Sequence, residues 1–206
     1  ASDGGFAHQG ANCMVLCNEE SYHRVASRYL NAAANMSIEE VKRNVARADA
    51  LYKPVYDNIK VKDTTGRDMN WVEAVVKAHR PDIVVLDMGD KFASKGNSES
   101  HVYLKDAAIH ARNIAKEYNC AVIWMSQLSA EAEGKAYPDQ SMMEGSKTGK
   151  AAEADLMILI SKNTPDNTIH DNDPIRRLNI AKNKLLGGWH GTIECQLDGA
   201  RSRYTA

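Results

Sequence analysis

Glu19, Asp87 and Gln127 each close a short apolar segment of the sequence, where they could act on a bound phosphate or metal ion. A carboxylate at the end of a buried strand can order Mg²⁺ and its waters beside a nucleotide, which is the Walker B pattern. Taken alone, an aspartate in such a position is more often a helix cap or a loop residue. The amide of Gln127, taken alone, is equally well explained as a cap on a backbone group.

These three residues can act together only if their segments are strands of one sheet. Residues 83–86 are apolar on both faces and rich in β-branched side chains, which is typical of a central strand in a parallel sheet covered by helices. Open α/β sheets bind ligands at the carboxyl ends of such strands. Strands and helices alternate along the chain, so we expect an α/β fold with a mainly parallel, twisted sheet flanked by helices. The predicted strands are 12–18, 58–62, 83–86, 120–125 and 156–160, and the predicted helices are 21–35, 37–52, 69–79 and 103–118.

The C-terminal part has a different pattern. Residues 177–182 and 191–197 are predicted to form an antiparallel hairpin at the sheet edge. Between the predicted strands, residues 129–150 form a long polar segment, and segments of this length within a compact domain are usually functional. With 206 residues, the chain is long enough for one domain with a full sheet and helices on both sides.

Composition excludes several classes of protein. A formal net charge of −1 provides no overall attraction to nucleic acid, so any such contact must be local. No segment is long and apolar enough to cross a membrane, and the first residues do not have the layout of a signal peptide. The four cysteines lack the spacing of a zinc site, and reduced, buried thiols are typical of a cytosolic protein.

One segment imitates a phosphate-binding loop. Residues 145–150, GSKTGK, have one residue too few between the glycines, and Ala151 stands where serine or threonine is required. No strand is predicted immediately before this segment, although the motif requires one. We therefore reject this segment as a Walker A loop.

Four segments, NEES, LDMGD, WMSQL and KNKLLGGWHG, occur in this order along the chain. Together they resemble the RecA-like motor domain of hexameric replicative DNA helicases of the DnaB type, and especially bacteriophage primase-helicases. That domain opens with a GxxxxGK[ST] loop and its helix, which precede the region of resemblance. The resemblance implies that residues 1–206 are a single RecA-like helicase core domain, incomplete at its N-terminal end. We therefore expect this polypeptide to bind ATP poorly, because the loop supplies most phosphate contacts.

The resemblance also implies roles for the three strand-end residues. Each of them is expected to bind the nucleotide and to take part in catalysis. Glu19 is expected to orient the attacking water, and Asp87 is expected to be the Walker B aspartate and the metal ligand. Gln127 matches the residue that senses the γ-phosphate and connects it to the DNA-binding loops. The alternative for Glu19 is an acidic residue placed at a helix N-terminus by the helix dipole, a role that Glu20 fits better.

A basic pair near the C-terminus matches a further motif of this family. Lys182 and Lys184 occupy the positions of a Lys-x-Arg pair that reaches into the nucleotide site of the neighbouring subunit. Lysine replaces the arginine at the second position, and it brings charge without the bidentate fork. Arg201 or Arg203 is a candidate to compensate at the nucleotide. The alternative for all four residues is a solvated basic surface.

DNA contacts are expected from the loops that follow the Asp87 and Gln127 strands. In the family, such loops point into the central channel of a ring and hold single-stranded DNA. Three glutamates, at positions 131, 133 and 144, partly offset the positive charge here, so backbone N–H contacts are expected to matter as much as lysines. The candidate DNA-binding residues are Lys91, Lys95, Lys135, Lys147 and Lys150.

The expected function is therefore that of an ATP-dependent replicative DNA helicase motor. The complete protein would hydrolyse ATP, or another NTP or dNTP, with Mg²⁺ and move along single-stranded DNA as a homohexameric ring. Primase and polymerase are further expected partners, and the expected location is the cytoplasm, that of the host cell if a phage encodes the protein. Two alternatives remain: a RecA- or KaiC-like recombination ATPase, and a nonhydrolysing RecA-like module that binds DNA or a partner.

Overall fold

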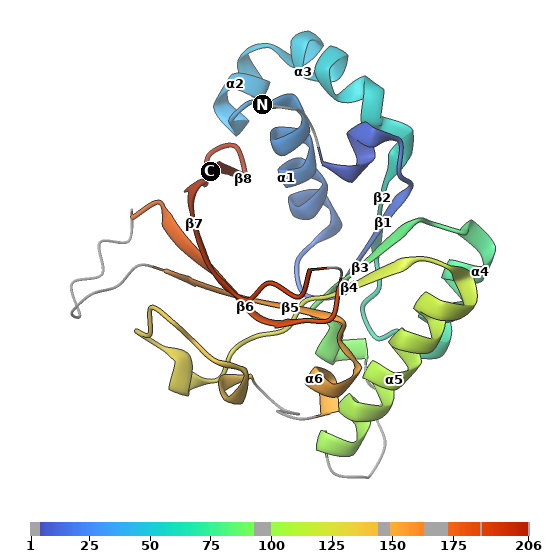
Figure 1. The fold of residues 1–206 in the computed structure, drawn as a ribbon. Helices are drawn as coiled ribbons and strands as arrows, with labels where there is room; N and C mark the ends of the chain where they lie inside the picture. Colours follow the sequence, from blue (N-terminus) through green and yellow to red (C-terminus); the bar gives the residue numbers. More distant parts are fainter. Residues whose placement is uncertain (1–4, 93–99, 144–148, 163–172, 186, 206) are drawn as a thin grey trace.

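The computed structural model describes residues 5–92, 100–143, 149–162, 173–185 and 187–205. Within these ranges the chain forms two four-stranded sheets, and helices pack on the first of them (Figure 1). The first sheet is built from the N-terminal part of the chain, and the second from the C-terminal part. This architecture confirms the predicted α/β fold.

The first sheet is entirely parallel, and its strand order is β2-β1-β3-β4. The register pairs Cys17 of β1 with Asp87 of β3, and Leu86 of β3 with Trp124 of β4. The carboxyl ends of these three strands therefore lie at one edge of the sheet. The amino ends of the strands lie together at the opposite edge. The bounds of the strands are Cys13–Cys17 for β1, Ile59–Asp63 for β2, Ile83–Asp87 for β3 and Ala121–Trp124 for β4.

Side-chain alternation along β1 explains how helices cover the parallel sheet. Met14 and Leu16 pack with α4 (Met69–His79) and α5 (Ser100–Tyr118) on one face, in the largest apolar cluster. Val15 and Cys17 point to the other face, where they pack against α1 (Tyr22–Ala34). The sheet is therefore covered on both sides near β1, as its apolar strands predict.

One predicted helix is divided in two. The capping box is present, with the Ser37 hydroxyl accepting from the Glu40 N–H, and it opens α2 (Ile38–Arg43). The helix predicted to continue to Tyr52 ends at Asn44, whose φ of −146° is not helical. The Asn44 side chain then caps α3 (Val45–Tyr52) by accepting from the Arg47 N–H at 3.0 Å. Asparagine competes with the helix in this way because its side chain bonds readily to nearby backbone groups.

The second sheet is antiparallel, with the order β5-β6-β7-β8. The predicted C-terminal hairpin is confirmed as β6 and β7, and it belongs to this larger sheet. β5, predicted as residues 156–160, pairs antiparallel with β6, and a short fourth strand pairs with β7. The strand bounds are Leu156–Lys162 for β5, Ile175–Asn183 for β6, Gly191–Asp198 for β7 and Arg203–Thr205 for β8.

Short helical turns complete the connections. The helix α6 (Gly149–Glu153) precedes β5. Among the described residues, no helix is long and apolar enough to cross a membrane. Five 3₁₀ turns lie elsewhere in the described chain: η1 (Phe6–Gln9), η2 (Lys53–Asn58), η3 (Gly89–Phe92), η4 (Ala130–Ala132) and η5 (Gln140–Met142).

Candidate functional site

The carboxyl edge of the parallel sheet carries all three strand-end residues. Glu19 lies two residues beyond the end of β1, Asp87 is the last residue of β3, and Gln127 lies three residues beyond β4. Because β1, β3 and β4 are parallel and in register, these positions share one edge. This is the edge at which open α/β sheets bind ligands.

Negative charge is concentrated around Asp87. Burial raises the pKa of Asp87 above its ordinary value, and the neighbouring carboxylates of Glu19 and Glu20 raise it further. Arg28 and Lys91 act in the opposite direction. Lys91 Nζ lies 3.6 Å from Glu19 Oε1, and Arg28 Nη2 donates to Glu20 Oε1 at 3.0 Å. The carboxylates are close enough to repel one another, and a bound cation would relieve that repulsion.

Mg²⁺ fits this environment. It is usually bound through one or two carboxylates while it keeps waters and phosphate ligands. Asp87 supplies a half-buried carboxylate here. The described residues contain no cluster of three His, Cys, Asp or Glu side chains that could hold a metal by themselves, so a nucleotide would have to complete the coordination. In the same loop, the buried Asn18 Oδ1 and Glu20 Oε2 have no hydrogen-bond partner among the described residues.

A sharp turn follows Asp87. Met88 has a positive φ of 56°, and the Gly89 N–H donates to the Met125 carbonyl at 2.8 Å. A Cβ on Gly89 would lie 2.5 Å from the Trp124 ring, so only glycine fits against this indole. The turn joins the ends of β3 and β4 and fixes the spacing between the residues that follow them.

A buried ion pair, which the sequence did not reveal, braces this edge. Asp90 accepts from Trp124 Nε1 at 2.9 Å and from Ser126 Oγ at 2.7 Å. Lys150 Nζ donates to both carboxylate oxygens of Asp90, at 3.0 and 2.8 Å, and its side chain is 5% exposed. The ammonium group of Lys150 is therefore inside the protein, which does not suit the DNA contact predicted for it. Its position at the end of GSKTGK gave no sign of a carboxylate partner far away in the sequence.

The other lysines predicted to contact DNA differ in position. Lys91 and Lys135 are exposed, on η3 and on the segment after η4, whereas Lys95 and Lys147 lie outside the described residues. The Gln127 side chain is exposed, and no hydrogen bond of its amide is found in the described part of the chain. The residues 145–148 of GSKTGK also lie outside that part, and Gly149 and Lys150 begin α6.

The basic residues near the C-terminus are mostly engaged within the chain. Lys182 Nζ donates to the carbonyls of Ala151 and Ala152 at the end of α6, and burial, followed by Lys184, lowers its pKa. Arg201 donates to Asp198 Oδ2 at 3.0 Å and to both carboxylate oxygens of Glu40, each at 3.0 Å. Lys184 is exposed and Arg203 is half-buried, and neither has an ion pair within the described ranges.

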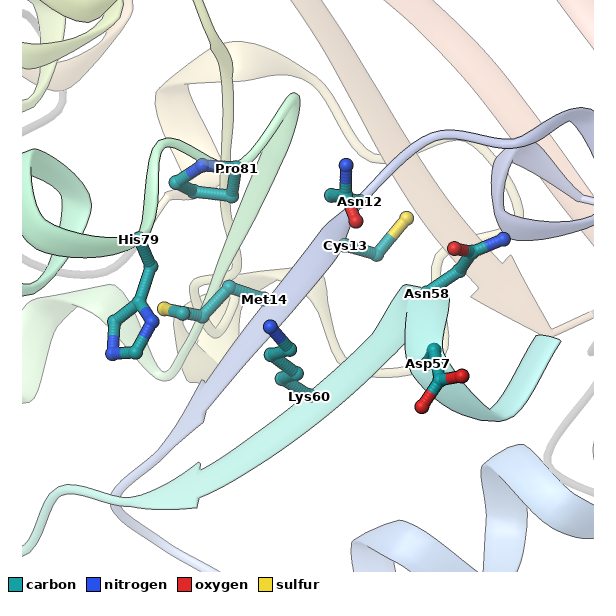
Figure 2. A pocket seen from close by; sticks show the side chains of 8 residues that line it. All are labelled: Asn12, Cys13, Met14, Asp57, Asn58, Lys60, His79 and Pro81. Atoms are coloured by element: carbon teal, nitrogen blue, oxygen red, sulfur yellow. The ribbon is translucent and has the colours of Figure 1, made fainter.

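A small pocket lies at the opposite end of the same strands. Figure 2 shows Cys13 and Met14 of β1 beside Lys60 of β2, with His79 and Pro81 across from them. Burial lowers the pKa of His79, and the nearby lysines 62 and 60 lower it further. The pocket is at the amino edge of the sheet, so it is separate from the strand ends at Asp87. It is lined by Asn12, Cys13, Met14, Asp57, Asn58, Lys60, His79 and Pro81.

Comparison with solved structures shows what this arrangement is similar to. A structure described as an ATPase domain matches with a TM-score of 0.83 and 17% identity, over 97% of this chain and 75% of that chain. The structure of a DnaB-like replicative helicase, solved for its interactions with primase, matches with a TM-score of 0.82 and 18% identity, over 97% of this chain and 51% of that one. At these identities, the likeness establishes the fold.

The family is shown by sequence. No match was found among curated proteins. A family model described as the AAA domain matches residues 2–133, which include β1 to β4 and the positions of Glu19, Asp87 and Gln127. The chain thus belongs to this family of AAA domains, and its fold is that of the RecA-like motor domain of DnaB-type replicative helicases.

Proposed function

We propose that this chain is the greater part of an ATP-hydrolysing motor domain of a replicative DNA helicase. The observation that carries the proposal is the in-register parallel sheet, which places Glu19 and Asp87 close enough for their charges to interact. Both matched solved structures have this fold, and one of them is described as a replicative helicase. The chain spans 75% and 51% of these two proteins, so the activity proposed is that of a longer polypeptide.

Each carboxylate at this edge would have its own task. Asp87 would help to hold Mg²⁺, which when bound would neutralise charge on the phosphates of ATP or of another NTP or dNTP. Glu19, which is exposed beside the half-buried Asp87, would accept a hydrogen bond from the attacking water and orient it toward the γ-phosphate. Lys91 Nζ, 3.6 Å from Glu19 Oε1, would help to hold that carboxylate in place.

Gln127 would report the state of the phosphate to the DNA-binding segments. Its neighbour Ser126 bonds to both Asp90 and Lys150, so the end of β4 is tied to η3 and to α6. Single-stranded DNA would contact the exposed Lys91 and Lys135. Lys95 and Lys147, on the same two connections, complete the proposed DNA surface, and the buried Lys150 is not part of it.

A ring of subunits would complete the nucleotide site. Lys184 is the exposed member of the basic pair, so we propose that it reaches a nucleotide held by the next subunit of a hexamer. Lys182 would support it by holding the end of α6. Arg203 would be a second contact to the nucleotide, whereas Arg201 is already held by Glu40 and Asp198. Primase or polymerase would bind the complete protein.

The experiment uses this chain joined to a segment that carries a GxxxxGK[ST] loop. Glu19→Gln is expected to lower ATP turnover by about 100-fold or more while nucleotide binding is retained, because only the orienting carboxylate is lost. Glu39→Gln, a matched change on the exposed surface of α2, is expected to leave turnover unchanged. Equal turnover in the two variants would remove Glu19 from the mechanism.

Shared sites can be tested by mixing subunits. Rings of Lys184→Ala subunits and rings of Glu19→Gln subunits are each expected to be slow. Mixed rings are expected to recover activity, because some interfaces then combine an intact Lys184 with an intact Glu19 on the neighbouring subunit. Full activity of rings made only of Lys184→Ala subunits would leave Lys184 as a solvated residue.

A nonhydrolysing module is the second candidate. It would apply to a polypeptide that has no GxxxxGK[ST] motif, and these 206 residues contain none. The 206-residue chain alone is expected to hydrolyse ATP at background level, even with single-stranded DNA present. Robust turnover by this chain would contradict both that expectation and the rejection of GSKTGK as a phosphate-binding loop.

A further inference from the structure

The strand β2 lies at the end of the parallel sheet, and its outer edge is unpaired in the described part of the chain. In the order β2-β1-β3-β4, it pairs only with β1. The Thr64 N–H, directly after β2, donates to the Cys17 carbonyl of β1 at 2.8 Å. Backbone groups point alternately to the two sides of a strand, so those of Ile59, Val61 and Asp63 point away from β1. Their N–H and C=O groups can pair with a further strand.

The two faces of β2 are covered differently. Val61 packs with Val25 and Tyr29 of α1, so alternate side chains of β2 face that helix. Lys60 and Lys62 point to the opposite face, where α4 and α5 pack on β1, β3 and β4. Among the described residues, the apolar cluster beneath these two helices contains no residue of β2. The two lysines therefore lie beside α4 and not beneath it.

The helix α4 presents a row of side chains toward β2. Glu73 accepts from Tyr118 of α5, so this side of α4 faces α5. Trp71, Val75 and His79, at spacings of four residues, share the other side of the helix. β2 lies in that direction, since α5 leads into β4 at the opposite end of the sheet. Trp71 and Val75 are half-buried, and His79 is exposed. Together with the two lysines, these three side chains form the β2–α4 surface.

Positive charge acts on the amino end of the β2–α4 surface. Burial lowers the pKa of His79, and Lys62 and then Lys60 lower it further, so both ammonium groups act on the imidazole. Neither lysine has an ion pair with a carboxylate of the described chain. Arg67 adds a positive charge at the other end, where its guanidinium lies 5.5 Å from the centroid of the Trp71 ring. The surface therefore combines three permanent positive charges with half-buried apolar side chains.

Three nearby carboxylates are turned away or already bonded. Asp63 is on the α1 face of β2, where it accepts from the Thr65 N–H at 3.0 Å. Asp68 caps the start of α4, and Asp82 accepts from the Asn12 N–H at 2.8 Å. None of these three carboxylates forms an ion pair with a lysine of β2 in the described part of the chain.

A small pocket marks the amino end of the β2–α4 surface. Figure 2 shows Lys60 with His79 on one side of it and with Asp57 and Asn58 on the other. The Met14 side chain lies between Lys60 and His79. The Lys60 ammonium and the His79 imidazole are hydrogen-bond donors, and both are suited to a carboxylate. This end of the surface can therefore hold one acidic side chain.

Candidate partners satisfy this edge to different extents. Lysines on an open edge repel a second copy of the same strand, because like charges would then stand side by side. Single-stranded nucleic acid would satisfy the lysines, but its sugar-phosphate backbone has no N–H groups for the C=O groups of Ile59 and Val61. An extended acidic peptide satisfies both, since its carboxylates meet the lysines and its backbone continues the ladder. Charge complementarity and the unpaired backbone together favour the peptide.

We propose that the free edge of β2 and the β2–α4 surface are the docking site for an extended acidic segment of a partner polypeptide. The segment would join the four-stranded sheet as a fifth strand and pair with the backbone of Ile59, Val61 and Asp63. Acidic residues at alternate positions would face Lys60 and Lys62, and the residues between them would face α1. Docking at this site does not depend on nucleotide binding at the carboxyl ends of the other strands.

The test is the binding of a synthetic peptide to the 206-residue chain. The peptide has about nine residues, in which glutamate alternates with valine and threonine, and it carries a fluorophore for anisotropy. Lys60→Gln with Lys62→Gln is expected to weaken binding about 10-fold at low salt, because two ion pairs are lost. Lys105→Gln with Lys116→Gln removes the same charge from exposed positions of α5 and is expected to change the Kd less than about 2-fold.

Amide exchange measured by NMR tests the backbone pairing. With the peptide at about ten times its Kd, exchange of the Ile59, Val61 and Asp63 N–H groups is expected to slow about 10-fold. Methylation of peptide N–H groups is a control that leaves the protein unchanged. Methylation of the glutamates alone, or of the intervening residues alone, is expected to abolish binding in one of the two peptides, because only one set of N–H groups faces β2. The glutamates are that set in a parallel strand, and the intervening residues are that set in an antiparallel one.

Four results with peptides would overturn the proposal. The first is no detectable binding of the glutamate peptide at about 1 mM. The second is equal binding of a peptide with glutamine in place of glutamate, and the third is equal binding by Lys60→Gln with Lys62→Gln. The fourth is binding of both N-methylated peptides, which would mean that the charges attract each other without an added strand.

Two further results would give the edge to another occupant. A single-stranded oligonucleotide of about 15 nucleotides that binds more tightly than the peptide, through the same two lysines, would make nucleic acid the partner. Slow exchange at β2 that depends on protein concentration, without any peptide, would make a second copy the partner. Failure of the complete protein to hydrolyse ATP would change none of these measurements, so the two proposals can fail separately.

Discussion

The two sheets bring polar side chains together in different ways. In the parallel sheet, β1, β3 and β4 end at one edge, so the residues that follow them share a site regardless of the lengths of the connecting helices. In the antiparallel sheet, charged residues meet partners on the next strand, as Arg177 meets Glu194 at 2.9 Å. A sequence pattern therefore predicts a candidate site in the first sheet, but it does not reveal which charged side chains of the second sheet have partners on the next strand.

The consequence is visible from Pro174 onward, where the sequence has six lysines and arginines, at positions 176, 177, 182, 184, 201 and 203. Four of these six donate hydrogen bonds within the chain, to carboxylates or to backbone carbonyls. For Lys184 and Arg203, no hydrogen bond to a carboxylate or a backbone carbonyl is found in the described ranges. From the sequence, Lys182 and Lys184 were matched to a pair that reaches a neighbouring subunit, and Arg201 or Arg203 was the candidate to compensate at the nucleotide.

The largest expected difference in stability is between two variants, each of which disrupts one ion pair at one of the two sheets. Asp90→Asn replaces the carboxylate that accepts from the buried Lys150 ammonium by a neutral amide, and we expect a loss of about 3 kcal/mol in the free energy of unfolding. Glu194→Gln makes the same carboxylate-to-amide change beside Arg177, where the glutamate side chain is 60% exposed, and should cost less than about 1 kcal/mol. Urea unfolding of both variants measures the difference. Losses of equal size would mean that burial does not distinguish the two pairs.

A smaller effect is expected from glycines in the two regions. Gly89→Ala puts a Cβ 2.5 Å from the Trp124 ring, so the indole or the backbone must shift, at a cost of about 1–3 kcal/mol. Gly199→Ala, in the turn between β7 and β8, meets nothing within 4 Å and should change stability by less than about 0.5 kcal/mol. Thermal unfolding is the measurement, and Trp fluorescence should shift only in Gly89→Ala. A neutral Gly89→Ala would show that the turn after Asp87 tolerates a side chain.

A weaker effect concerns pH and the contact between α2 and the second sheet. The capping box at Ser37 lowers the pKa of Glu40, with a further contribution from Arg201, and Arg201 lowers that of Asp198. The unfolded chain therefore binds protons first as the pH falls. The stability contributed by these groups is present above the ordinary carboxyl pKa of about 4 and is lost as the pH falls through the lowered values.

Arg201→Met tests that sign. The variant is expected to have a lower thermal midpoint than the parent at pH 7. The difference between the two midpoints should become smaller toward pH 3. Arg203 has no ion pair in the described part of the chain. The thermal midpoint of Arg203→Met should therefore differ from that of the parent by the same small amount at every pH. A gap between Arg201→Met and the parent that widens in acid would contradict the assignment of the ion pair.

The smallest expected effect on stability is at Lys184. Its side chain is exposed, so Lys184→Ala should leave the free energy of unfolding within about 0.5 kcal/mol of the parent. Lys182→Ala, which removes the donor to the carbonyls at the end of α6, should cost more, about 1 kcal/mol. Denaturant unfolding of the two variants makes the comparison. A larger loss at Lys184 would show that it supports the fold and is not free to reach a neighbour.

Much of the local structure could be predicted from periodicity and caps. The helix at Met69–His79 and the capping box at Ser37 are found where the sequence placed them. The interruption at Asn44 was missed because a single side-chain bond to the Arg47 N–H decides it. The strand β8 was missed because three residues carry too little alternation to be recognised.

The sequence by itself determined that polar residues stand at the ends of apolar strands, and in a parallel sheet this suffices to put them at one edge, because every such strand ends on the same side. Only the tertiary structure decided that Lys150 is buried on Asp90 and that Arg201 is held by Glu40, since these partners lie 60 and 161 residues apart along the chain. It also decided that the described strands form two separate sheets. Strand pairing and long-range ion pairs depend on which surfaces the helices bring together, and no local pattern of residues contains that information.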